Sequence, residues 1–188
     1  MNRQEALSIL KKYVKSDTLI KHSLAVEGSM RYYSNKFGED IERWSIAGIL
    51  HDVDYELYPD QHPLKGEDIL SEEKVDREII DSILGHADYT NIKRETKMAK
   101  ALYAVDELSS FIVACTLVRP SKSFDDLNLK SVKKKLKDKA FAKAVNRDTI
   151  KKGADELGID LDVHIQNVID ALAQREKELK QEGLSLVL

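Results

Sequence analysis

The stretch Ile49-Leu50-His51-Asp52-Val53-Asp54 decides how the rest of the chain is interpreted. An apolar helical run ends there in a histidine and an aspartate side by side. Both groups cost free energy when they are buried without partners, so core packing explains them poorly. Nitrogen and oxygen donors together suit Zn, Mn, Fe or Ni, and the pair is therefore typical of two ligands of one metal ion. The stretch predicts a metal site if further ligands occur elsewhere in the chain.

The composition indicates a globular protein with one sizeable core. The chain has 188 residues, of which 42% are hydrophobic and 34% charged, and its formal net charge of -3 argues against a general nucleic-acid binder. Cys115 is the only cysteine, which excludes an internal disulfide and a Cys-rich zinc site, and we expect it to be a buried small hydrophobe. No apolar stretch approaches the ~20 residues that span a bilayer, and the N-terminus lacks a signal-peptide pattern. We therefore expect a cytoplasmic protein that binds no membrane.

The pattern along the chain predicts an all-α fold. Only three prolines and eight glycines interrupt it, and no stretch alternates between polar and apolar residues with a period of two. Capping signals and apolar stripes predict helices over about 2–14, 17–37, 40–50, 63–71, 76–84, 95–118, 130–145, 148–157 and 160–181. The short apolar segment 184–188 is expected to dock on the body of the protein or on a second subunit, which leaves a homodimer open.

Histidines gather in the first half of the chain. Four of the five lie at predicted helix ends or loop junctions. His164 lies among polar residues of the last predicted helix without a partner motif, and we interpret it as a surface or hydrogen-bonded residue. Asp106 lies on an apolar helix, where a carboxylate is costly unless it is paired or bound to a metal. A buried salt bridge or a helix cap is the alternative for Asp106.

These residues are numerous enough for two metal ions. Two metals about 3.5–4 Å apart need around six protein ligands, including one bridging carboxylate. The candidate ligands are His22, His51, Asp52, His62, His86 and Asp106.

The same residues resemble the motifs of the HD-domain superfamily of metal-dependent phosphohydrolases. His22-Ser23-Leu24-Ala25-Val26 looks like the first histidine of the family on its helix, and Ala47-Gly48-Ile49-Leu50-His51-Asp52 looks like its central motif. Ala104-Val105-Asp106-Glu107 is similar to the closing aspartate motif. The resemblance runs from about Lys21 to Arg119 and implies an all-α helical bundle. On this basis we expect one HD-type domain over residues 1–188, with a metal-site core at about 18–120 and a C-terminal helical extension at about 121–188.

The resemblance also implies an activity. His62 and His86 match the two extra histidines of the binuclear branch, which includes the symmetrical diadenosine tetraphosphate hydrolases. It implies a phosphohydrolase that uses metal-activated hydroxide to cleave a phosphoester or phosphoanhydride of a nucleotide or another small phosphorylated metabolite. The cofactor would be two divalent transition-metal ions (Fe, Mn, Zn or Ni), with Asp52 as the bridge. Two alternatives stay open: an HD-fold di-iron oxygenase, and a non-catalytic module that binds metal and nucleotide.

The chain departs from the family directly after the His-Asp pair. Many members carry a lysine there, whereas this chain has Val53, Asp54 and Tyr55. Beside Asp52, the second candidate catalytic residue is Asp54, which acts either as a general acid/base or as a carboxylate that orients His51.

Cations for the phosphate must then come from elsewhere. We expect them from Lys65, Arg119 and Lys122. We interpret the run at 133–135 as a solvated face, with contact to the substrate as the alternative. Arg119 follows Asp106 by about three helical turns, roughly 20 Å. It therefore reaches the site only if the long helix breaks before Val118 or the chain folds back.

Overall fold

A computed structural model describes all residues, 1–188, and contains helices and no β-strand. This architecture confirms the predicted all-α fold. The α-helices are α1 (Arg3–Tyr13), α2 (Asp17–Phe37), α3 (Ile41–Leu50), α4 (Leu64–Glu72), α5 (Arg77–Leu84), α6 (Lys97–Leu117), α7 (Leu129–Lys137), α8 (Arg147–Leu157) and α9 (Leu161–Gln181). One short 3-10 helix, η1 (Asp88–Thr90), lies between α5 and α6.

Local sequence signals set most helix ends. Asn2 and Glu5 form a reciprocal capping box at the start of α1. The side chain of Asp40 accepts hydrogen bonds from two backbone amides of the first turn of α3. Gly38 ends α2 in the left-handed conformation, with a φ of 69°. These ends agree with the predicted ones, because each depends on residues within a few positions of the helix terminus.

The prediction for the basic helix was wrong at its C-terminal end. That helix, α7, ends at Lys137 instead of continuing to Val145, and Asp138 after it has extended backbone. The following turns are held by Arg147, whose guanidinium donates hydrogen bonds to the carbonyl oxygens of Ala142 and Val145 at 2.6 and 2.9 Å. A side chain that satisfies several backbone acceptors makes a compact loop as favourable here as another helical turn.

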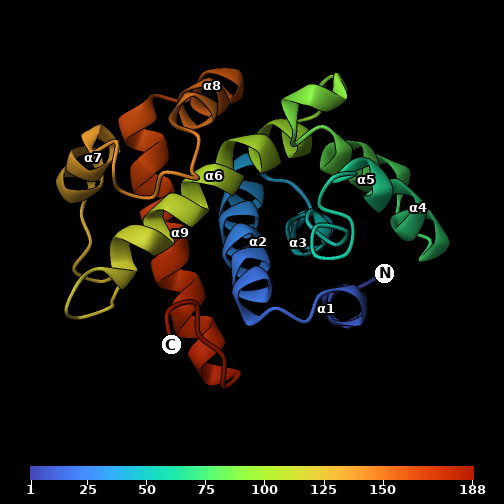
Figure 1. Cartoon of the computed structure of the whole chain (residues 1–188), viewed down its shortest axis with the longest axis horizontal. Coiled ribbons are helices and arrows are strands. Elements are labelled where there is room, and N and C mark those ends of the chain that lie inside the picture. The colour runs from blue at the N-terminus through green and yellow to red at the C-terminus, as the bar shows by residue number, and fades with distance from the viewer.

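The helices are arranged around α2 and α6, which cross near the centre of the molecule (Figure 1). In this view α1, α3, α4 and α5 lie on one side of the crossing, and α7, α8 and α9 lie on the other. Helix α2 contacts α3, α6 and α9, and α6 also contacts α5 and α8. No helix in the structure combines the length and the apolar character needed to span a membrane.

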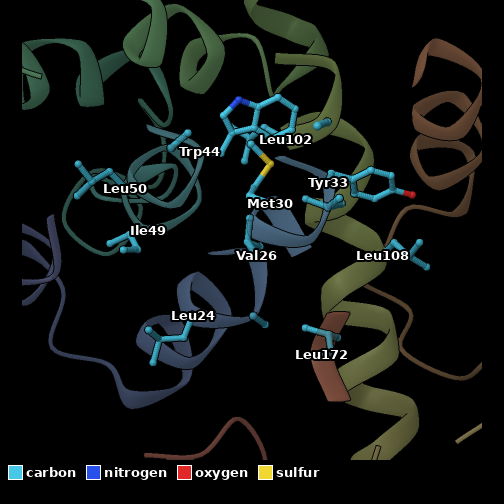
Figure 2. Close-up of a cluster of buried hydrophobic side chains, with 14 of the residues drawn as sticks. Leu24, Val26, Met30, Tyr33, Trp44, Ile49, Leu50, Leu102, Leu108 and Leu172 are labelled. Atoms are coloured by element: carbon cyan, nitrogen blue, oxygen red, sulfur yellow. The ribbon is translucent and has the colours of Figure 1, made fainter. Parts of the chain in front are cut away.

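A continuous hydrophobic core fixes these helices against one another (Figure 2). Each of the labelled side chains is at most 2% exposed. Complete burial of such a side chain contributes about 1.5–3 kcal/mol. The labelled residues come from α2, α3, α6 and α9: Leu24, Val26, Met30, Tyr33, Trp44, Ile49, Leu50, Leu102, Leu108 and Leu172. Three of these helices, α2, α3 and α6, also carry predicted metal ligands, so the core fixes the positions from which the ligands project.

Two glycines allow close helix contacts beside the predicted ligands. A Cβ on Gly48 of α3 would lie 2.7 Å from the Cα of Glu27 on α2. A Cβ on Gly153 of α8 would lie 2.6 Å from the Cα of Ala104 on α6. Real Cβ atoms do not approach backbone this closely, so any other residue would push these helices apart.

The C-terminal segment docks on the body of its own chain. Leu186 and Val187 are buried, and the amide of Leu186 donates a hydrogen bond to the carboxylate of Glu176 at 2.7 Å. Cys115 is 3% exposed, and burial raises the pKa of its thiol to about 12, so it is the inert hydrophobe that was predicted.

Candidate metal centre

Six side chains from separate parts of the chain meet at one place. They are His22 in the second turn of α2, His51 and Asp52 at the end of α3, His62 in the loop before α4, His86 just after α5, and Asp106 near the middle of α6. These are the six candidate ligands that the sequence predicts, and the distances below show how they group.

The first group is formed by two histidines and two aspartates. The Nε2 atom of His22 lies 3.0 Å from that of His51, 3.0 Å from Oδ1 of Asp106 and 3.4 Å from Oδ2 of Asp52. The Nε2 atom of His51 lies 3.3 Å from the same oxygen of Asp52 and 3.5 Å from that of Asp106. The Nε2 atom of His22 therefore has three other donor atoms within 3.4 Å.

The second group shares Asp52 with the first. Its other oxygen, Oδ1, lies 3.4 Å from Nε2 of His62 and 3.6 Å from Nε2 of His86. The two histidine nitrogens are 3.2 Å apart. Each group contains three or more donors that could hold a metal ion, and Asp52 faces both groups.

The spacing of the donor atoms fits a transition metal. Donors about 2.1 Å from one ion lie about 3.0 Å apart at neighbouring octahedral positions and about 3.4 Å apart in a tetrahedron. The separations from 3.0 Å for His22 and His51 to 3.6 Å for His86 and Asp52 cover this range.

Hydrogen bonds on the far side of three histidine rings determine which nitrogen carries the lone pair when the ring is neutral. The Nδ1 atom of His51 lies 2.9 Å from the carbonyl oxygen of Gly48, and that of His86 lies 2.5 Å from the carbonyl oxygen of Ile83. The Nδ1 atom of His62 lies 2.7 Å from the carboxylate of Asp54. Each of these oxygens only accepts, so Nδ1 carries the proton and Nε2 of the neutral ring does not. Adjacent lone pairs cannot satisfy each other, whereas a cation between them satisfies both.

The electrostatics of the cluster favour a positive charge. Burial lowers the pKa of His22, but the carboxylates of Asp106 and Asp52 more than offset this, and its pKa is raised to about 9. Burial raises the pKa of Asp106 and the histidines His22 and His51 lower it, so that its pKa falls well below the ordinary value. Two ionised aspartates in a partly buried site therefore attract a cation, and a metal ion competes there with a proton.

Asp54 contacts a different histidine from the one that the sequence predicts. The structure corrects its expected partner, because Asp54 accepts from His62 and not from His51, whose Nδ1 is bonded to Gly48. Its second oxygen accepts a hydrogen bond from the amide of Gly66 at 2.7 Å. Both carboxylate oxygens of Asp54 accept hydrogen bonds and the residue is completely buried, so Asp54 contacts His62 on the side of the ring away from the cluster.

A cavity of about 560 Å³ opens onto the cluster. Side chains from both halves of the chain line it, including Tyr55 and Tyr89 at 44% and 63% exposure, and Asn146 and Thr149 from the start of α8. Four carboxylates line the cavity, and no lysine or arginine does: they belong to Asp52, Asp88, Asp106 and Glu107.

The cations expected at the phosphate do not reach this cavity. Helix α6 continues unbroken to Leu117, so the expected break before Val118 does not occur. Arg119 instead pairs with Asp126 at 3.1 Å within the loop that follows. Lys65 pairs with Asp68, three residues further along α4, at 2.8 Å. Lys122 lies in the same exposed loop as Arg119 and does not line the cavity.

Another charged cluster lies at the edge of the cavity, and the sequence alone did not point to it. The carboxylate of Asp88 accepts hydrogen bonds from Arg94 at 2.9 Å, Lys152 at 2.8 Å and the Tyr103 hydroxyl at 2.9 Å. Burial raises the pKa of Asp88, and these three partners together lower it to about 2. The partners come from positions up to 64 residues away, so no local motif pointed to them.

His164 is not part of the metal cluster. It is completely buried on α9, where its Nδ1 lies 2.5 Å from the Tyr33 hydroxyl and its Nε2 lies 2.9 Å from the carbonyl oxygen of Ala104. It is therefore the hydrogen-bonded residue of the sequence analysis, and burial lowers its pKa.

Comparison with known proteins agrees with this geometry. The family model described as the HD domain matches residues 19–175, a range that includes all six clustered side chains and extends past the boundary near 120 that was predicted for the metal-site core. Searches among curated proteins and among solved structures each found no match. The match covers most of the chain, and the protein belongs to the HD domain family.

Proposed function

We propose that this protein is a phosphohydrolase with two divalent transition-metal ions. Members of its family are commonly metal-dependent phosphohydrolases. The observation that supports two ions is the orientation of Asp52. Its Oδ2 lies 3.3 Å from Nε2 of His51, while its Oδ1 lies 3.4 Å from Nε2 of His62. A carboxylate that offers one oxygen to each of two donor groups is the arrangement expected of a bridging ligand. This orientation supports our proposal that the chain belongs to the binuclear branch of the family.

The protein contributes by fixing the orientation of the side chains that would bind the metal ions. Two divalent ions, when bound, stabilise the charge of a phosphoryl group and make hydroxide available near neutral pH. The carbonyl oxygen of Gly48 fixes the ring of His51, and the carboxylate of Asp54 fixes the ring of His62. Such outer partners orient metal ligands and keep the correct nitrogen unprotonated. Asp54 therefore acts as a positioning residue, not as a general acid/base.

The substrate is a small phosphorylated molecule, and nucleotides are the first class of substrate to test. The cavity of about 560 Å³ has the size of a small-molecule site. Its carboxylates would repel a phosphate, so the bound metals must supply the positive charge. Tyr55 and Tyr89 expose their rings at this cavity, and exposed aromatic rings suit stacking on a planar base. Diadenosine tetraphosphate, the substrate of the hydrolases that the sequence resembles, is the first dinucleotide to test.

The C-terminal helices belong to the same functional unit. Helices α8 and α9 pack on α6 and α2, and Asn146 and Thr149 contribute to the wall of the metal cavity. These contacts support the expectation that residues 1–188 form one domain.

A phosphate-release assay on purified protein tests the proposal. The panel contains nucleoside mono-, di- and triphosphates and diadenosine tetraphosphate, each with Mn or Zn as the added metal. We expect release of phosphate or nucleotide from at least one of them and loss of turnover in Asp52→Asn. Asp60→Asn, an exposed aspartate in the neighbouring loop, is the control and should keep full activity.

The same assay separates the alternatives. An oxygenase would consume oxygen and would fail with redox-inert Zn. A non-catalytic module would bind nucleotide without releasing phosphate under any metal. Either result would contradict the proposal.

A further inference from the structure

Positive charge is concentrated in one part of the chain. Residues 130–152 contain ten lysines and arginines and two aspartates, although the whole chain has a net charge of -3. This segment includes α7 and most of α8. The segregation of charge means that the surface over α7 and α8 is basic while the remainder is acidic.

The basic residues converge on a second cavity. This cavity, about 680 Å³ in volume, is lined by residues of α7, the loop after it, α8 and α9. Its cations are Lys133, Lys137, Lys139, Arg147 and Lys151. Its apolar wall is formed by Leu136, Ile150, Leu161 and Ile165.

Three of the five cations have neither an ion pair nor a hydrogen bond within the protein. Lys133 pairs with Asp162 at 2.6 Å, and the guanidinium of Arg147 is engaged by backbone carbonyls of the preceding loop. Lys137, Lys139 and Lys151 are exposed, and none of them pairs with a carboxylate. Unpaired like charges around one cavity repel each other, and an anion between them relieves that repulsion.

This basic cavity is separate from the metal cavity. The two cavities share no lining residue, although residues of α8 line both. Asn146 and Thr149 line the metal cavity, whereas Asp148 and Lys151 line the basic one. The basic cavity is therefore a different candidate site with the opposite charge, and it does not depend on the proposed hydrolysis.

We propose that the basic cavity binds a small molecule that carries several phosphate groups and an apolar body. Its volume lies in the range of about 300–1,000 Å³ that is typical of small-molecule sites. Its cationic rim suits phosphate oxygens, and its aliphatic wall suits the face of a base or a similar apolar group. No aromatic residue lines it, so it lacks the stacking platforms typical of grooves that bind single-stranded nucleic acid.

Isothermal titration of the full-length protein with ATP tests this site. The titrations are done in the Asp52→Asn background, so that binding at the metal cluster and turnover do not contribute. The cavity variant Lys137→Gln/Lys139→Gln/Lys151→Gln removes the three unpaired cations of the basic cavity. The matched control Lys130→Gln/Lys134→Gln/Lys143→Gln removes three exposed lysines of the same segment that do not line the cavity.

The proposal predicts a difference between the two variants. The cavity variant should bind ATP about thirty-fold more weakly, because three exposed charge contacts are lost. The ATP affinity of the control variant should change less than about threefold. Adenosine should bind much more weakly than ATP. Equal effects of the two variants would overturn the proposal, and so would adenosine binding as tight as that of ATP. A different result would be tighter binding of oligouridine or polyglutamate than of ATP, in a way that requires the three unpaired lysines of the basic cavity. That result would overturn the proposal in favour of a polymeric partner.

Discussion

The carboxylate of Asp54 accepts a hydrogen bond from Nδ1 of His62 at 2.7 Å, and the whole of Asp54 is buried. The same carboxylate accepts a hydrogen bond from the amide of Gly66. In the proposed function, the carboxylate two residues after Asp52 works through a histidine and not directly on the substrate. This contact explains how a loop residue such as His62 is held with its Nε2 atom toward Asp52 and His86.

Asp54→Asn should weaken the second metal group selectively. The amide keeps the size of the carboxylate, but its NH2 group cannot accept a hydrogen bond from His62 or Gly66. Loss of such an outer partner typically lowers metal affinity by about 10–100-fold. Competition titration with a chelator should detect this loss for one ion, while the other ion keeps its affinity. The control is Asp68→Asn, an exposed carboxylate of α4, which should bind metal as the wild type does.

Arg119→Ala should leave catalytic efficiency within about twofold of the wild type, as is usual for a half-buried surface residue away from the site. Its guanidinium pairs with Asp126 in the loop after α6 and does not line the metal cavity. Steady-state kinetics on the best substrate of the panel would measure the effect. A tenfold or larger fall would mean that the loop moves to the substrate and would contradict the structure.

Glu156→Gln should lower stability in a pH-dependent way. Two nitrogens of Arg94 bond the carboxylate at 2.7 Å each, and this contact lowers the pKa of Glu156. A lowered pKa in the folded state means that the contribution is present above the unfolded pKa of about 4.3 and is lost as the pH falls below it. We expect the variant to lose about 1 kcal/mol of unfolding free energy at pH 7, with the difference shrinking toward pH 3.

Urea unfolding at several pH values measures this difference. Glu95→Gln, an exposed glutamate that forms no ion pair, is the control and should match the wild type throughout. A difference that stays constant down to pH 3 would assign the effect to packing and not to charge.

Gly153→Ala should destabilise the protein even though alanine favours helix. The added Cβ would lie 2.6 Å from the Cα of Ala104, so α8 must shift away from the helix that carries Asp106. Overpacking of this kind costs about 1–3 kcal/mol, which exceeds or offsets the gain of about 1 kcal/mol in helix propensity. Thermal unfolding should remain a single transition with a lower midpoint, as expected if α8 belongs to the same domain as α6. Asp155→Ala on the exposed face of α8 should change the midpoint little.

The fold could be predicted from the sequence because its signals are local. The capping box of Asn2 and Glu5 and the left-handed Gly38 each involve a few consecutive residues. The C-terminal end of α7 could not be predicted in the same way. It depends on Arg147, which lies ten residues beyond Lys137 and bonds the carbonyls of the loop between them.

The candidate ligands could be identified by residue type, but their partners could not. A histidine or aspartate in an apolar helix is unusual wherever its partners lie, so His51 and Asp106 stood out. Which carboxylate supports which ring is a tertiary property, and Asp54 supports His62 eight residues away instead of His51. The placement of lysines and arginines was unpredictable for the same reason, since exposed cations carry no pattern that distinguishes Lys65 from Lys152.

The number of metal ions tests the central claim most directly. Elemental analysis of protein purified without chelator should give two ions per chain. His86→Ala removes a donor of the second group and leaves the donors around His22 untouched, so it should give about one. Anomalous scattering from crystals should place one ion beside His22 and His51 and the other beside His62 and His86, with Asp52 between them. A single ion per wild-type chain, with His62 and His86 outside bonding distance of it, would contradict the account.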